Sequence, residues 1–314
     1  MPSITQLQYI VALHRTGHFG KAAVECHVSQ PTLSSLIAKA EEELGVVLFD
    51  RRKKPVEPTE PGLALIALAQ EVVTAHERLM AAAAGAVDAS GQLVLGVIPT
   101  LAPYVLPWFL GPFTERYPRV SLTVVERTTE DIVDQIRTLR MDAGILATPL
   151  GESVLEARVL FYDPFYVYAE ATSELLEAGE VAVDDLDAAG LWLLEDGHCF
   201  RNQVVHLCGR EARRNLATVR FEAGSFETLR ALIDQAGGFT LVPESYARTL
   251  PPAVRLARIR PLREPVPVRE VSLVSHRSSW KTTQIDACAD ILRAHVPRCF
   301  PRERGTSEVV PIEG

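Results

Sequence analysis

Residues 29–55 read SQPTLSSLIAKAEEELGVVLFDRRKKP, and this stretch decides the fold of the N-terminal part of the chain. Pro31, which closely follows Ser29, predicts a helix start, because proline has no N–H to lose in the first helical turn. We expect the helix to run over about residues 30–44 and to end at Gly45, which suits a left-handed C-terminal cap. Its inward-facing apolar residues would be Leu33, Ile37, Ala40 and Leu44.

The two ends of this stretch carry side chains suited to DNA. The first turn of the helix presents short polar groups that reach base edges and phosphates, and the loop after Phe49 contains a run of basic residues. A helix followed by a basic hairpin is typical of a winged helix-turn-helix whose third helix enters the major groove. The predicted DNA-contacting residues are Gln30, Pro31, Thr32, Ser34 and Ser35 on the helix and Arg51, Arg52, Lys53 and Lys54 on the wing.

Two shorter helices complete this unit upstream. Ser3 and Gln6 have the spacing of a capping box and open a helix with an apolar face, which Gly17 ends. An Ala-rich helix over residues 21–26 follows, and its small side chains allow close helix packing. Residues 1–54 hold seven Lys/Arg and five Asp/Glu, a local charge of +2 within a chain of net charge −8. The overall acidity therefore does not exclude nucleic acid as a partner.

Residues 60–86 are rich in Ala, Leu and Val, and we interpret them as one long linker helix within residues 59–87. About 26 helical residues span roughly 40 Å. A helix of this length with an apolar stripe needs a partner helix, so the segment predicts dimerisation, and a dimer would read two half-sites on DNA. Residues 85–91 resemble a hinge. The stripe consists of Leu63, Ile66, Ala69, Val73, Leu79 and Met80.

Beyond Gly91, short apolar runs alternate with amphipathic stretches, which predicts an α/β domain with a parallel sheet. Ligands bind such folds where strands end and helices begin. Thr100, Thr129 and Ser225 occupy transitions of this kind, although a residue of this type is more often a helix cap than a ligand contact. The expected strands are residues 93–98, 120–125, 143–147, 191–194 and 239–242, and the expected helices are residues 103–116, 130–140 and 226–235.

A second informative stretch, residues 195–208, reads EDGHCFRNQVVHLC. If it is helical, the nine residues from Cys199 to Cys208 advance about 13.5 Å and turn roughly 900°, which leaves the two sulfurs on opposite faces. A disulfide requires Cα atoms about 5.5 to 6 Å apart. The two cysteines can therefore join only if the helix refolds, and this is the logic of a redox switch. His198 and Arg201 lie close enough in sequence to favour a reactive thiolate.

Other interpretations of these cysteines are open at this point. Cytosolic cysteines are commonly small buried hydrophobic residues without chemistry. A zinc site of His198, Cys199, His206 and Cys208 has the right ligand types, but a helix places the two cysteines on opposite faces. Five cysteines, an odd number, fit a reducing cytosol, and the sequence predicts neither a signal peptide nor a membrane span. The cysteines without comparable surroundings are Cys26, Cys288 and Cys299.

The N-terminal sequence resembles the LysR-type transcriptional regulators. The motifs that carry this resemblance are the Ala-Ala helix, residues 28–34 (VSQPTLS), Leu44-Gly45 and residues 48–51 (LFDR). Further motifs resemble the peroxide-sensing subgroup of that family, and they are residues 194–203 (LEDGHCFRNQ) with Cys208, residues 96–107 (GVIPTLAPYVLP) and residues 225–230 (SFETLR). The likeness extends from the start of the chain to about residue 296.

The resemblance implies a multidomain protein that assembles as a tetramer. An all-α winged helix-turn-helix over residues 1–58 and a linker helix over 59–87 would precede an α/β, periplasmic-binding-protein-like regulatory domain over 91–300. The domain would have two subdomains, about 91–161 with 267–300 and about 162–266, and residues 301–314 would form a flexible tail. The implied function is transcriptional control of antioxidant genes by hydrogen peroxide, with no cofactor and no metal.

The resemblance also implies roles for individual residues. Cys199 would be the peroxidatic cysteine and Cys208 the resolving one, joined in a redox-active disulfide after oxidation. Hydrogen peroxide would lie among Thr100, Thr129, His198 and Arg269. One departure is Asn202, where the family has Asp. An amide still forms hydrogen bonds but takes up no proton as a carboxylate does, which places the rate of disulfide formation in question.

Two other function classes compete with a peroxide-sensing regulator. A metabolite-responsive regulator of the same family would bind a small anion through Thr100, Thr129 and Ser225, and its cysteines would be passive. A thiol peroxidase would leave the DNA-binding module unexplained and would need a reductase for turnover. For the peroxide sensor, the expected partners are double-stranded promoter DNA, hydrogen peroxide and further copies of the chain, together with RNA polymerase and glutaredoxin or thioredoxin in the cytoplasm.

Overall fold

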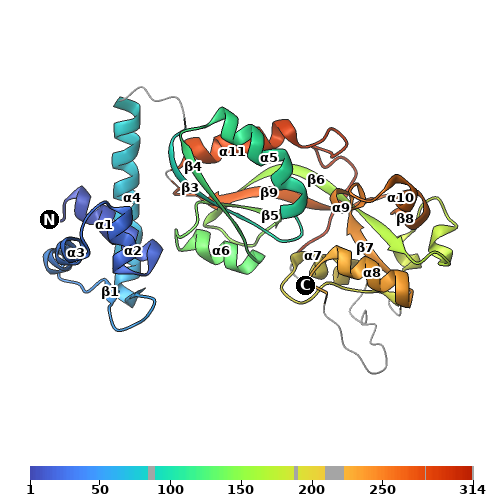
Figure 1. Ribbon diagram of the computed structural model, residues 1–314, viewed down its shortest axis with the longest axis horizontal. Helices are drawn as coiled ribbons and strands as arrows, with labels where there is room; N and C mark the ends of the chain where they lie inside the picture. The colour runs from blue at the N-terminus through green and yellow to red at the C-terminus, as the bar shows by residue number, and fades with distance from the viewer. Residues whose placement is uncertain (84–88, 187–189, 209–222, 280, 313–314) are drawn as a thin grey trace.

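The computed structural model describes residues 1–83, 89–186, 190–208, 223–279 and 281–312. Figure 1 shows a helical N-terminal unit, a long helix that leads away from it, and an elongated α/β domain. The winged helix-turn-helix, the linker helix and the α/β regulatory domain expected from the sequence are all present. None of the helices in these described ranges combines the length and apolar character that crossing a membrane requires.

The N-terminal unit consists of three helices and a two-stranded wing. Ser3 opens the first helix through a complete capping box with Gln6, and Gly17 closes it in the left-handed conformation (φ 61°). Ser29 caps the third helix by accepting a hydrogen bond from the N–H of Thr32. The elements are α1 (Ile4–Thr16), α2 (Phe19–Glu25), α3 (Gln30–Leu44), β1 (Phe49–Asp50) and β2 (Glu57–Pro58).

The apolar helix faces expected from the sequence are buried in the core of this unit, with one exception. Leu33, Ile37 and Ala40 of α3 are fully buried in a cluster with residues of α1 and α2. Leu44 was also expected to face inward, but its side chain is exposed. The helix ends at this residue, and the buried side chains of Leu48 and Phe49 from the wing fill the core in its place.

The linker helix α4 (Glu60–Ala83) carries two apolar stripes. One contains Ile66, Ala69 and Val73, which are buried where α4 packs along α1. The other contains Leu68, Val72 and Leu79, which lie within about 40° of one another around the helix axis. Their side chains are between 46% and 66% exposed, and Leu63 and Met80 are exposed as well. The end of the expected helix and most of the expected hinge fall on residues 84–88, outside the described ranges.

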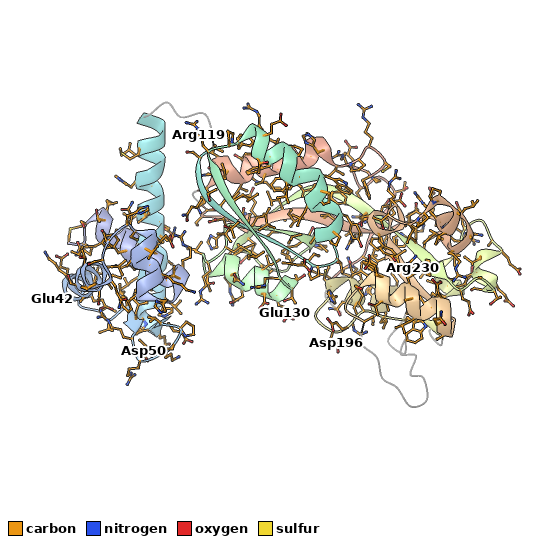
Figure 2. All side chains as sticks on the ribbon, in the orientation of Figure 1. Glu42, Asp50, Arg119, Glu130, Asp196 and Arg230 are labelled. Atoms are coloured by element: carbon orange, nitrogen blue, oxygen red, sulfur yellow. The ribbon has the colours of Figure 1, made fainter. Side chains whose placement is uncertain are left out.

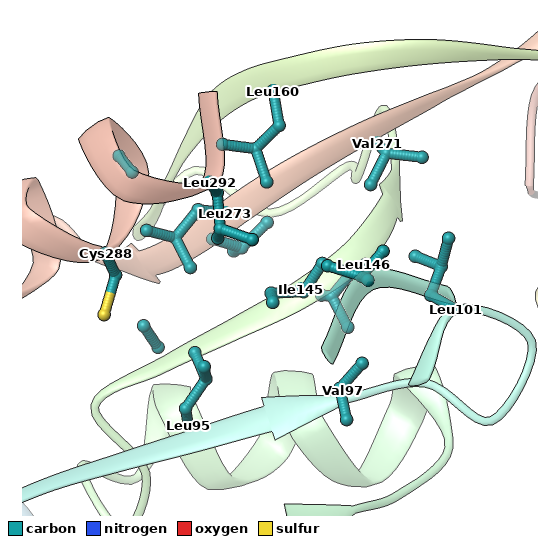
Figure 3. Packing of buried hydrophobic residues seen from close by; sticks show 14 of the residues in the cluster. Leu95, Val97, Leu101, Ile145, Leu146, Leu160, Val271, Leu273, Cys288 and Leu292 are labelled. Atoms are coloured by element: carbon teal, nitrogen blue, oxygen red, sulfur yellow. The ribbon is translucent and has the colours of Figure 1, made fainter. Parts of the chain in front are cut away.

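The first half of the regulatory domain has the expected βαβ pattern. Three strands pair in parallel, and the helices between them connect one strand to the next. In Figure 3, Leu95, Val97 and Ile145 from two of these strands lie in one cluster with Leu273 and Leu292 from the C-terminal part of the chain. The elements are β3 (Gly91–Val97), α5 (Ala102–Arg116), β4 (Val120–Glu126), α6 (Thr129–Arg137) and β5 (Ala143–Thr148).

The sheet is mixed, so the expectation of a parallel sheet was wrong. Two long strands that were not expected, β6 (Leu155–Ala169) and β9 (Pro267–His276), run antiparallel to each other along the domain. β9 also pairs antiparallel with β5, and β6 pairs antiparallel with β7 (Phe239–Pro243) and β8 (Ile259–Pro261). The strand order is β4-β3-β5-β9-β6-β7. Local alternation of apolar residues does not report strand direction, which depends on partners about a hundred residues away.

Two hydrophobic clusters fill the domain. One surrounds β3, β5 and the last helix, and the other surrounds β6 and β7. The strand expected over residues 191–194 is absent, because this segment touches its neighbours only through single bridges of Leu191 to Phe239 and of Leu194 to Ala223. The remaining helices are α7 (Cys199–Cys208), α8 (Phe226–Ala236), α9 (Glu244–Ala247), α10 (Pro252–Arg258) and α11 (Thr282–His295), with short 3₁₀ turns at Glu174–Leu176 and Val183–Asp185.

The C-terminal segment differs from the flexible tail that the sequence suggested. Glu308–Val309 form β10, which pairs in parallel with the start of β9. The carbonyl of Pro301 accepts a hydrogen bond from the N–H of Tyr162. Val310 and Ile312 are buried, one in each hydrophobic cluster. This apolar burial and the strand pairing hold residues 301–312 against the domain, and residues 313–314 lie outside the described ranges.

Candidate redox site

The helix α7 begins at Cys199 and ends at Cys208, so the two cysteines stand at its opposite ends. Gly197 turns the chain into this helix with φ +95°, a conformation that other residues rarely adopt. All five cysteines are free thiols. The helical segment therefore belongs to the reduced protein, as the geometric argument from the sequence requires.

The two thiols pack in different hydrophobic clusters. Cys199 is buried in the cluster around β3, β5 and α11, whereas Cys208 packs at the edge of the cluster around β6 and β7. Nine helical residues separate them by about 13.5 Å along the axis. A bond between the two sulfurs therefore requires α7 to unwind.

Two opposing effects act on the Cys199 thiol. Burial is the larger, and it raises the pKa of the thiol above its usual range. The hydroxyl of Thr129, the positive charge of Arg269 and backbone hydrogen bonds at Phe200 and Ala147 lower the pKa. These groups stabilise the thiolate without compensating fully for desolvation. The sequence predicted surroundings that favour the charged form, but the burial of the thiol outweighs them.

Thr129 places its hydroxyl beside the sulfur of Cys199. Its Oγ1 atom is buried and has no well-formed hydrogen bond to any described residue. Thr128, not Thr129, caps α6, because its side chain accepts the hydrogen bond from the N–H of Asp131. The Thr129 hydroxyl is therefore not used by the helix end, and it is available to an oxygen-containing ligand next to Cys199.

A buried ion pair lies next to this position. Arg269 and Asp163 both have 0% side-chain exposure, and Arg269 Nη2 lies 2.8 Å from Asp163 Oδ2. The two residues face each other across the β9–β6 pairing. Asp163 also accepts hydrogen bonds from the N–H of Ser245 at 3.0 Å and from its hydroxyl at 2.7 Å. These contacts fix the guanidinium, since a buried charge without a partner is costly.

From this anchor, Arg269 reaches Thr100. Its Nη1 donates to Thr100 Oγ1 and its Nη2 to the Thr100 carbonyl, both at 3.2 Å. The guanidinium also lies over the ring of Phe200, 5.4 Å from the ring centre. Thr100 does not cap α5, because Leu101 holds the N-cap position. The fold thus brings Cys199, Thr129, Arg269 and Thr100 into one buried site.

Three residues singled out in the sequence make other contacts. His198 is buried, and its Nε2 lies 3.6 Å from Glu195 Oε1. Arg201 pairs with Asp196 at 2.7 Å, and Figure 2 places Asp196 near α7 at the edge of the domain. Both side chains therefore have acidic partners of their own, which sequence proximity to Cys199 did not reveal. Ser225 caps α8, which is the ordinary structural role considered for it above.

Asp163 and Ser245 were not expected from the sequence. A signal for Asp163 was present, because it is the only charged residue within residues 159–169 (VLFYDPFYVYA). A lone carboxylate in an apolar strand requires a buried partner, and Arg269 lies in the mostly buried strand β9. No local signal marks Ser245, because its role depends on where α9 lies relative to β6.

The other four thiols differ in burial and, among the described residues, lack the hydrogen-bonding surroundings of Cys199. Burial raises the pKa of Cys208 to about 12 and also raises the pKa values of Cys288 and Cys26. Cys299 is exposed. Within the part of the chain that the structure describes, no three His, Cys, Asp or Glu side chains are grouped as a metal site.

The expected DNA-contacting residues lie on the exposed surface of the N-terminal unit. Those at the start of α3 are exposed, except that Ser34 is half-buried. Arg51, Arg52, Lys53 and Lys54 of the wing are all exposed. Figure 2 places Asp50, at the start of this basic run, at the lower end of the unit. Both sets of side chains are therefore accessible from solvent.

Three of the four wing cations form ion pairs with acidic side chains. Arg51 pairs with Glu41 at 2.7 Å, Arg52 with Asp50 at 3.1 Å and Lys53 with Glu57 at 2.5 Å. Lys54 pairs with no residue that the structure describes. To bind DNA, the three paired cations would have to exchange their carboxylate partners for phosphates. Lys54 could bind a phosphate without losing an ion pair.

Comparison with known proteins identifies both parts of the chain. Residues 4–63 match the family model of the bacterial regulatory helix-turn-helix protein, lysR family, and residues 87–297 match the LysR substrate binding domain. A hydrogen peroxide-inducible genes activator from Dickeya chrysanthemi is 34% identical over 301 residues, which cover 94% of this chain and 96% of that protein.

Solved structures with the same architecture also match nearly the whole chain. A full-length OxyR variant from Pseudomonas aeruginosa is 32% identical, with a TM-score of 0.80 over 94% of this chain and 99% of that one. A hydrogen peroxide-bound OxyR mutant from Corynebacterium glutamicum is 29% identical, with a TM-score of 0.59 over 94% of this chain and 92% of that one.

Proposed function

Because the chain belongs to the LysR family of DNA-binding transcriptional regulators and is similar over nearly its whole length to a hydrogen peroxide-inducible genes activator and to an OxyR structure, we propose that it senses hydrogen peroxide and controls antioxidant genes. The observation that carries the proposal is the buried Cys199 thiol, beside the buried hydroxyl of Thr129 and the anchored guanidinium of Arg269. A buried thiol is accessible to a small, uncharged oxidant. The hydrogen-bond donors around it stabilise the anion that departs when the oxidant reacts.

In the first step, the Cys199 thiolate attacks one oxygen of the peroxide. The S–O bond forms as the O–O bond breaks, so the sulfur loses two electrons and becomes a sulfenic acid. The departing oxygen leaves as hydroxide and takes up a proton to give water. Thr129, Thr100 and Arg269 would stabilise the negative charge that develops on this oxygen, because donors placed in advance act most strongly in a buried site. His198, which also lines this end of α7, would orient the peroxide.

In the second step, the thiolate of Cys208 attacks the sulfenic sulfur of Cys199. The S–S bond forms, the S–O bond breaks, and the oxygen leaves as water after protonation. Cys208 reaches Cys199 only after α7 unwinds, so the covalent bond selects a second conformation of this segment. Such a bistable element can alter how the subunits are arranged and how they contact DNA.

The remaining partners follow from this function. We propose that α4 joins two chains, that two dimers form a tetramer, and that the α3 and wing surfaces of each dimer bind two half-sites of promoter DNA. RNA polymerase would respond to the oxidised form. A cytosolic thiol reductase such as glutaredoxin or thioredoxin would reset the disulfide, because the cytosol keeps thiols reduced.

A transcription assay with two cysteine variants tests the proposal. Cys199→Ser should lose induction of a promoter reporter by peroxide while the purified protein still binds promoter DNA. Cys288→Ser removes a buried thiol in the same hydrophobic cluster and should leave induction intact. Induction by peroxide in Cys199→Ser would contradict the proposal and would favour a regulator that responds to a small metabolite.

A further inference from the structure

The C-terminal segment Glu308–Ile312 lies between the start of β9 and the redox helix α7. Its N–H groups extend the sheet beside Arg269, since Glu308 N donates to the Val266 carbonyl and Val310 N to the Val268 carbonyl, both at 3.0 Å. The segment therefore runs along β9 immediately before the residue that reaches Thr100. This position is set by backbone pairing and does not depend on the outward side chain of Glu308.

Two amides of α7 hold the same segment. The side chain of Gln203 is fully buried, and its Nε2 donates to the Val310 carbonyl at 2.8 Å. Asn202 Nδ2 donates to the Ile312 carbonyl at 3.3 Å. Both residues lie between the two cysteines of the helix. Any refolding that joins Cys199 to Cys208 must therefore move the groups that bind the C-terminal segment.

The apolar side chains of the segment reinforce this attachment. Val310 is 1% exposed in the cluster that contains Phe200 and Val204 of α7, and Ile312 lies in the cluster that contains Cys199. Alternate residues of the segment are thus buried in the two clusters to which α7 also contributes side chains. Refolding of α7 would disturb both clusters and weaken this burial.

The hydrogen bond from Asn202 also gives a physical reason for the one departure from the family motif. A carbonyl oxygen accepts hydrogen bonds, so the side chain that faces Ile312 must be a donor. An ionised carboxylate at this position would place two acceptors against each other. An amide at residue 202 and a docked C-terminal segment are therefore matched features of this chain.

We infer that Glu308–Ile312 is an intramolecular ligand of α7 that holds the redox helix in its reduced, helical form and so sets how readily Cys208 reaches oxidised Cys199. The inference rests on the proposed function for its redox consequence, but the contact itself is a property of the reduced protein. Removal of the segment lowers the cost of unwinding α7. The attack of Cys199 on peroxide precedes that unwinding, so it is unaffected.

The experiment compares the full chain with a chain that ends at Ser307, and with Val310→Asp, which keeps the length but cannot bury residue 310. Glu308→Gln is the matched control, because this exposed side chain takes no part in the contact. In the reduced proteins without peroxide, amide hydrogen exchange over residues 199–208 should be at least tenfold faster in the truncated chain and in Val310→Asp. Exchange as slow as in the full chain would overturn the inference, whatever the cysteines do.

The redox consequence is measured in two separate steps. Trapping of the sulfenic acid with a cyclic diketone in a Cys208→Ser background should give the same rate with and without the segment. Disulfide formation after a peroxide pulse should be about tenfold faster without it. The equilibrium should also favour the disulfide about tenfold, which corresponds to about 30 mV for a two-electron couple. Unchanged or slower disulfide formation would overturn the inference. If no disulfide formed in any of the proteins, the proposed function would be refuted, and the hydrogen-exchange rates alone would test whether the segment stabilises α7.

Discussion

The sulfur of Cys199 is subject to burial and to hydrogen bonding, which shift the pKa of its thiol in opposite directions. Because burial is the larger effect, the thiol should be mostly protonated at neutral pH and the reactive thiolate should be a minor form. The rate of sulfenic acid formation in Cys208→Ser should therefore rise about tenfold per pH unit between about pH 6 and 8. Stopped-flow peroxide consumption measures this rate, and a constant rate over that range would mean that the pKa is lowered instead.

The ion pair between Asp163 and Arg269 predicts a stability effect at a single residue. Asp163→Asn leaves the guanidinium buried without its counter-charge, and the free energy of unfolding should fall by about 3–5 kcal/mol. Asp134→Asn is the control, because its partner Arg137 and Asp134 itself are about half exposed, and it should change stability by less than about 0.5 kcal/mol. Urea denaturation of the reduced proteins distinguishes the two, and equal stabilities would show that Arg269 is not held as the contacts suggest.

Part of the redox site could be predicted from the sequence, and part could not. The Cys199–Cys208 spacing and the position of Thr100 and Thr129 after strands are local features, so they could be read directly. The pairing of Arg269 with Asp163 depends on the register of two distant strands, and the acidic partners of His198 and Arg201 depend on side-chain directions. The residues of a short stretch of sequence reveal neither the register of distant strands nor the directions of side chains.

Among the elements, the wing predicts a specific electrostatic effect. Lys54 has no acidic partner in the described part of the chain, so Lys54→Ala should weaken binding to all DNA sequences alike and lower the salt dependence by about one ion. Arg137→Ala on α6 lies outside the DNA-binding unit and should leave both quantities unchanged. DNA affinity titrated over a range of salt concentrations gives the result, and an unaltered salt slope in Lys54→Ala would place the wing away from phosphate.

The elements also show where sequence patterns are informative. Helix ends were readable because Ser3, Ser29, Gly17 and Gly45 act within one turn of the chain. The antiparallel pairing of β6 with β9 and the docking of β10 were not readable, because each depends on surfaces that exist only after the domain has folded. Residues 301–307 contain no large apolar side chain, and of residues 301–312 only Val310 and Ile312 are buried on the domain.

For the whole molecule, the exposed stripe of Leu68, Val72 and Leu79 on α4 predicts self-association. A charge at its centre, Val72→Glu, should weaken the dimer at least tenfold, because each large apolar side chain buried at an interface contributes about 1.5–3 kcal/mol. The affinity for a promoter with two half-sites should fall with it. Glu71→Gln, next to the stripe, should remain dimeric in sedimentation, and a dimeric Val72→Glu protein would exclude this face as the interface.

In the proposed switch, one disulfide bond between two residues requires the helix α7 to unwind, and this unwinding alters the assembled regulator. The most direct measurement is mass-spectrometric mapping of all five thiols in the reduced protein before and after about one equivalent of hydrogen peroxide. A disulfide between Cys199 and Cys208 that forms within seconds, while Cys26, Cys288 and Cys299 remain free, is the expected result. If Cys199 and Cys208 stay reduced, or if either pairs with another cysteine, the peroxide switch proposed for this chain is wrong.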